Sequence, residues 1–189
     1  MNTEKKTAVI IGIGYLGLKL ANELLSLGYN VFGTTRDTEK KNFITKNGFF
    51  PILWDKNASD EIEKINPKLI ISTVAPNEIG DQIIDYISDY LNSYEGWLGY
   101  ISATSVYGEN KKIFDEYCKC FPNTIRGKRR LKAENSWSVF GSEIFRVAGI
   151  YGPEKSFFQK LKNKQFQLIK KENHVFNRIH IDDLVGIIL

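Results

Sequence analysis

The chain has 189 residues, of which 42% are hydrophobic and 25% are charged, and its formal net charge is +4. These values are ordinary for a globular protein, no stretch approaches the roughly 20 apolar residues of a membrane span, and the polar segment 1–6 lacks the apolar core of a signal peptide. We therefore expect a cytoplasmic protein without a membrane span. Because the sequence contains no repeat, low-complexity tract or linker, we expect one domain over residues 1–189.

Short apolar runs alternate with helical patterns along the chain, which is typical of an α/β fold with a mainly parallel sheet. We predict a Rossmann-like, doubly wound sheet with helices on both faces. The predicted strands occupy residues 7–11, 30–34, 49–53, 69–73, 97–102 and 144–148. Apolar residues three or four positions apart predict helices over residues 16–27, 79–91, 123–140, 156–164 and from 182 to the end. Gly28 is expected to end the first helix in a left-handed conformation.

Gly12, Gly14 and Gly17 form a Gly-x-Gly-x-x-Gly pattern between the first predicted strand and the first predicted helix. In this position Gly12 permits a sharp turn, Gly14 lets a pyrophosphate approach the backbone, and Gly17 lets the helix pack closely on the strand. Tyr15 and Leu16 begin the helix, whose N–H groups and positive dipole end favour an anion. The pattern predicts a cofactor-binding turn, and the alternative is a tight turn without a ligand.

The end of the second predicted strand distinguishes the two nicotinamide cofactors. An acidic residue there accepts hydrogen bonds from the ribose hydroxyls of NAD, whereas this chain carries Thr34, Thr35 and Arg36. The planar guanidinium of Arg36 suits a 2′-phosphate, and the two threonines can donate hydrogen bonds to it. The sequence therefore favours NADP. NAD remains the alternative, because Asp37 follows immediately.

Further segments resemble the extended short-chain dehydrogenase/reductases, the family of NAD-dependent epimerases and dehydratases that act on nucleotide sugars. Trp54-Asp55 is similar to the family position whose Asp approaches the adenine. Three segments resemble, in order, the family's Ser-rich run ending in Val-Tyr-Gly, the run after strand six and a late Arg-x-His-x-x-Asp run: 102–108, 146–153 and 178–183. The resemblance covers nearly the whole chain and implies cofactor contacts at Asp55, Thr73 and Val74.

The resemblance also implies a catalytic Tyr and Lys four residues apart on a helix, and here the chain departs from the family. Alignment on Ala133 places Arg126 at the Tyr position and Arg130 at the Lys position. An arginine stays protonated and cannot take over the proton transfer of the tyrosine. The family's catalytic Ser or Thr corresponds to Ala103. These departures resemble the divergent branch of the family, called atypical, that lacks the Tyr/Lys pair.

Two functions from different classes are consistent with these motifs. The first is an NADP-dependent reductase, epimerase or dehydratase acting on a nucleotide sugar or related carbonyl compound. Thr104 or Tyr107 would then supply the proton, and Arg126 and Arg130 would hold an anionic group of the substrate. The alternative is a catalytically inactive protein that senses NADP or serves as a scaffold.

The last segment raises a separate expectation about partners. Family members continue beyond the Arg-x-His-x-x-Asp run with a further strand and the rest of a substrate-binding lobe, whereas this sequence ends at Leu189 inside an apolar helical run. We therefore expect an incomplete substrate lobe. We also expect a protein partner, or a second copy, to cover the apolar helix.

Other binding classes have weaker signals. Basic residues gather in segments 126–132 and 160–171, which we interpret as solvated helix faces rather than as a nucleic-acid site. Cys118 and Cys120 are one residue apart, and no second pair of ligands follows them. The sequence therefore predicts neither a metal site nor a disulfide framework.

Overall fold

A computed structural model describes residues 5–108, 113–156, 161–164 and 175–189. The chain divides into two compact units, Met1–Arg146 and Val147–Leu189. The first unit contains the predicted cofactor turn and all the positions at which the resemblance implies catalysis.

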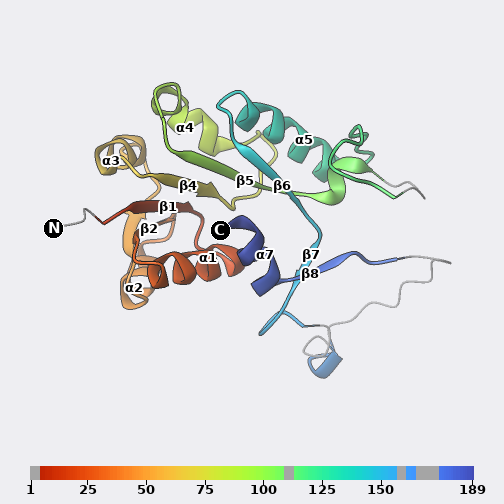
Figure 1. Cartoon of the computed structure of the whole chain (residues 1–189), viewed down its shortest axis with the longest axis horizontal. Helices are drawn as coiled ribbons and strands as arrows, with labels where there is room; N and C mark the ends of the chain where they lie inside the picture. The colour runs from red at the N-terminus through yellow and green to blue at the C-terminus, as the bar shows by residue number, and fades with distance from the viewer. Residues whose placement is uncertain (1–4, 109–112, 157–160, 165–174) are drawn as a thin grey trace. The chain divides into compact units, whose positions relative to one another are not determined.

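A six-stranded sheet forms the centre of the first unit, in the order β3-β2-β1-β4-β5-β6 (Figure 1). The pairings of β1 with β2 and β4, of β2 with β3 and of β4 with β5 are parallel. The strands are β1 (Thr7–Ile11), β2 (Asn30–Thr35), β3 (Phe50–Leu53), β4 (Leu69–Ser72), β5 (Trp97–Ala103) and β6 (Glu143–Val147). The strand order reverses between β1 and β4, and ligands of open α/β sheets bind at the carboxyl ends of the strands at such a point.

Helices cover both faces of this sheet. Figure 1 shows α1 and α2 on one face and α3, α4 and α5 on the other. The helices are α1 (Tyr15–Ser26), α2 (Thr38–Lys46), α3 (Ala58–Ile65), α4 (Gln82–Leu91) and α5 (Ile125–Ser138), and the short 3₁₀ helix η1 (Thr104–Tyr107) follows β5. The predicted doubly wound, Rossmann-like α/β fold is therefore confirmed.

The core under α3, α4 and α5 holds the bulkiest buried side chains. Trp137 of α5 stacks on Tyr100 of β5, with ring centroids 5.4 Å apart. Both residues are fully shielded from solvent, and aliphatic residues of β1, β4 and α4 surround them. This packing fixes α5 against β5, and it therefore fixes the helix that carries Arg126 and Arg130.

The predicted strands and most of the predicted helices are confirmed with shifts of one to three residues at their ends. Gly28 has a φ of +85° and ends α1 as expected, with Tyr29 N–H donating to Leu24 and Gly28 N–H donating to Leu25. The predicted start of α4 at Ile79 is wrong. The helix begins at Gln82, and Ile79 is 76% exposed.

Asp81 is the reason that α4 begins late. Its carboxylate accepts a hydrogen bond from the N–H of Ile83 at 3.0 Å, which caps the helix at residue 81. The isoleucine spacing that predicts a longer helix includes one residue that precedes this cap. A capping side chain therefore overrides the periodicity.

The second unit contains a parallel pair of short strands, β7 (Gly149–Tyr151) and β8 (Arg178–His180), followed by α7 (Ile181–Ile188). Its described apolar helix buries Ile181, Leu184, Val185 and Ile188. The expectation of exposed apolar surface holds for Ile187, which is 64% exposed. Residues 157–160 of the predicted helix at 156–164, and most of the basic segment 160–171, lie outside the described residues.

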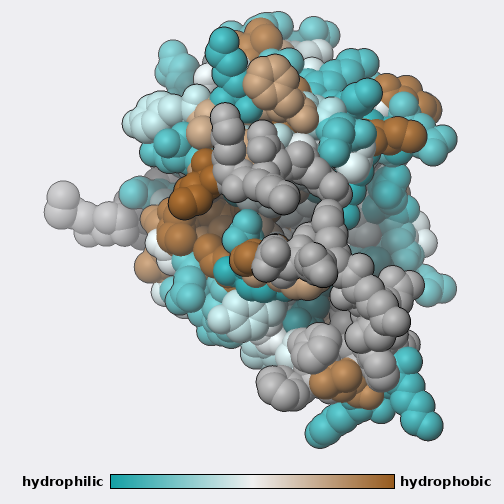
Figure 2. Space-filling model, turned by 90° about the vertical axis from the view of Figure 1, so that its right-hand side faces the viewer, coloured by the Kyte–Doolittle hydropathy of each residue, from teal (hydrophilic) through white to brown (hydrophobic). Residues whose placement is uncertain are grey.

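The surface mixes apolar and polar side chains, as the face drawn in Figure 2 shows. Several large apolar residues between η1 and the start of α5 are exposed: Ile113, Tyr117, Phe121 and Ile125. Among the described helices, none is long and apolar enough to cross a membrane.

Candidate functional site

The glycine turn connects β1 to α1 at the point where the strand order reverses. Gly12 has a φ of +95°, in the left-handed region that residues with a side chain rarely adopt. An added Cβ at Gly12 would lie 2.7 Å from Val74, and one at Gly17 would lie only 2.1 Å from the Gly12 carbonyl oxygen. The folded chain itself therefore requires glycine at both positions.

Gly14 differs from these two glycines. A Cβ added there would meet no atom of the protein within 4 Å, and the residue is exposed. Packing of the described chain therefore gives no reason for glycine at this position. A ligand that contacts the backbone closely would give one.

The N-terminus of α1 is suited to an anion. Gly14 is the N-cap and offers no side chain, and the first turn of α1, all of it described, contains no acidic residue. The first N–H groups of a helix have no carbonyl partner within the helix, and the helix dipole places partial positive charge there. A phosphate group would satisfy both features.

Two threonine hydroxyls hold the peptide groups of Gly12. The N–H of Gly12 donates to Oγ1 of Thr34 at 2.9 Å, and Oγ1 of Thr73 donates to the Gly12 carbonyl at 2.7 Å. Thr34 is only 4% exposed. The buried hydroxyl is hydrogen-bonded to the turn, and its predicted contact with a cofactor phosphate stays a prediction.

The end of β2 is organised by local hydrogen bonds. Oγ1 of Thr35 accepts a hydrogen bond from the N–H of Asp37 at 3.1 Å. The carboxylate of Asp37 caps α2 by accepting from the N–H of Glu39 at 2.9 Å. Arg36 is exposed between them. Of the residues expected to distinguish the cofactors, Arg36 thus presents a charged group to solvent, while Asp37 already has a structural partner.

The other expected cofactor contacts lie beside the turn or after β3. Val74 approaches Gly12, as the short distance to an added Cβ shows. Asp55 is exposed, and its Oδ1 accepts a hydrogen bond from the N–H of Asn57 at 2.8 Å. Val74 and Thr73 therefore belong to the turn. Asp55 lies in the loop after β3, with its second oxygen outside this hydrogen bond.

Arg126 and Arg130 lie one helical turn apart on α5 but have different environments. Arg126 is exposed in the first turn. Arg130 is buried, and its Nη1 donates to the Tyr100 hydroxyl at 3.2 Å and to the Ile101 carbonyl at 2.6 Å. The guanidinium of Arg130 is thus hydrogen-bonded in the protein interior, and the role of both arginines in holding an anionic substrate group stays a prediction.

Arg130 also lies near the buried carboxylate of Asp81. Burial raises the pKa of Asp81, and a hydrogen bond from Trp137 Nε1 at 2.7 Å and the charge of Arg130 oppose this shift. Burial likewise raises the pKa of Tyr100 to about 12. The position at which the resemblance implies a catalytic lysine is thus part of a buried polar cluster.

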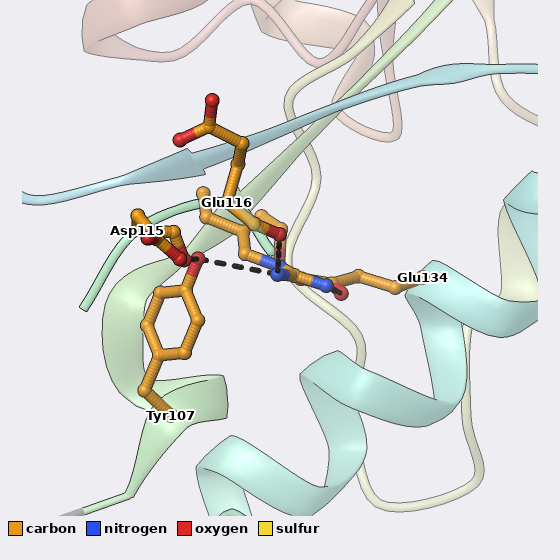
Figure 3. Close-up of polar contacts among 6 residues, drawn as sticks. Tyr107, Asp115, Glu116 and Glu134 are labelled. Carbon is orange, nitrogen blue, oxygen red and sulfur yellow. Dashed lines mark hydrogen bonds and ion pairs between the residues drawn. The ribbon is translucent and has the colours of Figure 1, made fainter. Parts of the chain in front are cut away.

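Tyr107 of η1 is engaged on both sides of its hydroxyl (Figure 3). The hydroxyl donates to the Asp115 carbonyl at 2.9 Å and accepts from Arg146 Nη1 at 3.1 Å. The ring stacks on Phe114 and lies 5.1 Å from the Arg146 guanidinium. The expected role of Tyr107 as a proton donor requires a hydroxyl that reaches substrate, and this hydroxyl is used within the protein. Thr104, at the start of η1, is half-buried.

Glu134 of α5 links Arg146 of β6, the partner of Tyr107, to Ser102 of β5. Its buried carboxylate accepts hydrogen bonds from Arg146 and from the hydroxyl of Ser102. Burial lowers the pKa of Arg146, but the hydrogen bonds that its guanidinium donates to Glu134 and Tyr107, together with the charge of Glu134, raise it above its already high value. Ser102 and Arg146 each begin a segment that resembles the family, and the contact of both residues with Glu134 follows from the fold.

Cys118 interacts with Asp115, and Cys120 lies near Arg146. The thiol of Cys118 lowers the pKa of the Asp115 carboxyl by hydrogen bonding, and burial raises the pKa of Cys120. Both thiols are free. No group of three or more metal-binding side chains occurs within the described ranges.

No protein-family model matches the chain, and no curated protein matches it. Solved structures do. A conserved protein of unknown function from Silicibacter pomeroyi is 28% identical and superposes with a TM-score of 0.84, covering 97% of this chain and 67% of that one. A protein of Methylobacillus flagellatus, provisionally named an NAD-dependent epimerase/dehydratase, is 25% identical with a TM-score of 0.75, covering 98% and 69%.

A third structure is the UDP-glucuronic acid 4-epimerase of Bacillus cereus, in complex with UDP-glucuronic acid and NAD. It is 18% identical, with a TM-score of 0.73, and the match covers 95% of this chain and 70% of that one. At this identity the match shows the fold. The chain thus spans about two thirds of the length of all three structures.

Proposed function

From the structural match to the NAD-dependent epimerases and dehydratases, the extended short-chain dehydrogenase/reductases, we propose that the chain binds a nicotinamide dinucleotide at the turn between β1 and α1. The observation that carries this proposal is the contrast between the three glycines. Gly12 and Gly17 are required by the protein's own packing, whereas Gly14 faces open space beside an uncapped helix N-terminus. A pyrophosphate at Gly14 accounts for both features.

We further propose that the preferred cofactor is NADP. Arg36 is exposed at the end of β2, where the adenosine ribose is expected, and Asp37 already caps α2. A guanidinium binds a 2′-phosphate through charge-assisted hydrogen bonds, and the carboxylate that would favour an unphosphorylated ribose has another partner. The Bacillus cereus epimerase complex contains NAD. The proposal of NADP for this chain therefore rests on its own residues at the end of β2.

Titration with NADPH and with NADH, followed by nicotinamide fluorescence, tests both proposals. We expect NADPH to bind more tightly, and we expect Arg36→Ala to weaken NADPH by about tenfold or more while leaving NADH unchanged. Lys64→Ala is the matched control, because it removes an exposed cation at the end of α3, which leads into the amino-terminal end of β4, whereas Arg36 follows the carboxyl-terminal end of β2. Absence of binding by either dinucleotide would refute the proposed function.

The residues at the expected catalytic positions support binding without the family's proton transfer. Ala103 lacks a hydroxyl, Arg126 cannot act as the acid, and Arg130 is buried against Tyr100. A bound nicotinamide supplies hydride chemistry, but the proton must then come from another group. We propose a dinucleotide-binding protein whose response to the cofactor, rather than turnover, is its function.

A second candidate function is enzymatic, and the exposed position of Arg126 supports it. This cation lies in the first turn of α5. The helix packs against η1, which begins at Thr104. Arg126 could hold an anionic group of a carbonyl substrate, such as the diphosphate of a nucleotide sugar, while Thr104 donates a proton. NADPH-dependent turnover that falls in Thr104→Val and in Arg126→Ala would support this candidate. Turnover that is unchanged in both variants would exclude these roles.

A further inference from the structure

Two threonines from different strands hold opposite ends of Gly12. Thr34 lies near the end of β2 and Thr73 directly follows β4, and these two strands flank β1 on either side. The hydroxyl of Thr34 accepts a hydrogen bond from the Gly12 N–H. The hydroxyl of Thr73 donates a hydrogen bond to the Gly12 carbonyl and, at 3.3 Å, to the Ile11 carbonyl. We call these two hydroxyls the threonine clamp.

The clamp fixes the one residue of the turn whose backbone conformation is unusual. Gly12 has a φ of +95°. Because glycine has no Cβ, its backbone can also adopt many other conformations. The hydrogen bonds to both sides of the residue remove that freedom. The bond to Thr34 also provides an acceptor for the partly buried N–H group of Gly12.

The position of Gly12 determines where the rest of the turn lies. Its carbonyl oxygen also accepts from the N–H of Gly14 at 3.0 Å, and it closely approaches Gly17. A rotation of the Gly12 peptide would therefore displace Gly14, where the pyrophosphate is proposed to bind, together with the first turn of α1. Holding Gly12 thus positions the anion-binding groups before any ligand arrives.

From these contacts we propose that Thr34 and Thr73 are positioning residues for dinucleotide binding, acting through Gly12 and touching no part of the 2′-phosphate. This inference rests on the proposed function. It makes a specific prediction, because a residue that positions the pyrophosphate site affects NADPH and NADH equally. A residue that contacts the 2′-phosphate affects NADPH alone.

Thr34→Val tests this inference, since valine keeps the shape of threonine and removes the hydroxyl. We expect affinity for NADPH and for NADH to fall by the same factor, about tenfold, and Thr34→Ser to restore both because it restores the acceptor. Thr73→Val is expected to act in the same way from the other side of β1. Thr45→Val, near the far end of α2, is the matched control and is expected to leave both affinities unchanged.

A loss confined to NADPH would overturn the inference in favour of direct phosphate contact, and unchanged affinities in both valine variants would also overturn it. Hydrogen exchange of the Gly12 amide in the ligand-free wild-type protein decides the matter even if a variant does not fold or no dinucleotide binds. We expect a protected amide. Exchange as fast as that of an exposed loop amide would refute the clamp itself, independently of the proposed function.

Discussion

Glu134 of α5 and Arg146 of β6 form a partly buried ion pair in which Nε and Nη2 of the arginine donate to the same carboxylate oxygen, at 3.1 and 3.0 Å. The other oxygen of Glu134 accepts from the hydroxyl of Ser102 in β5. One carboxylate thus joins a helix to two neighbouring strands. Glu134 is only 3% exposed, so solvent cannot replace these hydrogen bonds.

Glu134→Gln is expected to lower the free energy of unfolding by about 3 kcal/mol, because it leaves a partly buried guanidinium without its counter-charge. Urea denaturation measures this change. Glu143→Gln is the control, since Glu143 is exposed at the start of β6, and a change within about 0.5 kcal/mol is expected there. Equal stabilities of the two variants would contradict a structural role for the ion pair.

Gly14→Ala and Gly17→Ala are expected to separate binding from folding. A Cβ at Gly14 meets open space, so this variant should keep its stability and lose dinucleotide affinity by about tenfold or more. A Cβ at Gly17 meets the Gly12 carbonyl, so this variant should lose stability as well as affinity. Thermal unfolding and fluorescence titration report the two properties. Normal affinity in Gly14→Ala would argue against a ligand at that residue.

Arg126→Ala and Arg130→Ala are expected to change the stability by very different amounts. Loss of Arg130 leaves the Ile101 carbonyl and the Tyr100 hydroxyl without a donor and should lower the free energy of unfolding by about 2 kcal/mol or more. Loss of the exposed Arg126 should change it by less than about 0.5 kcal/mol. Chemical denaturation of the two variants decides the assignment, and a larger effect at Arg126 would reverse it.

Asp81 predicts a pH dependence of stability. Because burial raises its pKa in the folded state above the ordinary value of 3.8, the folded protein binds more protons than the unfolded chain in the window just above that value. The contribution of Asp81 to stability therefore decreases as pH rises from 3.8 through the raised pKa. In Asp81→Asn this decrease should be absent. Urea unfolding across the window measures it, with the exposed Asp89→Asn as the control, and parallel curves for wild type and Asp81→Asn would contradict the prediction.

Much of the fold could be predicted from local patterns, because strands buried on both faces have continuous apolar runs and α1 has a regular leucine stripe. The helices α2 and α3 were missed for a physical reason. Ile44 is the single buried residue of α2, so that helix shows no repeated apolar spacing. In α3 the apolar spacing rests on Ala58, Ile62 and Ile65 alone, which is a short pattern for a helix of eight residues. Their N-terminal turns instead contain acidic residues, a weaker signal that could have found them.

The site was predictable only where a residue's role depends on its own backbone. Gly12 and Gly17 belong to this class. The partners of Thr34 and Arg130 lie 22 and about 30 positions away along the chain, so no local pattern distinguishes a buried hydroxyl or guanidinium from an exposed one. One signal was present for Arg130. It shares a helical face with Ala133 and Trp137, at the three- and four-residue spacing that marks a buried stripe.

The threonine clamp has a consequence for synthesis on the ribosome. Thr34 follows Gly12 by 22 residues, whereas Thr73 follows it by 61, because β4 is the second neighbour of β1. While the chain emerges, β1 can pair with β2 early but has one open edge until β4 is made. The two hydrogen bonds of the clamp therefore cannot form at the same time during synthesis, and the bond from Thr73 must wait until residue 73 has left the exit tunnel.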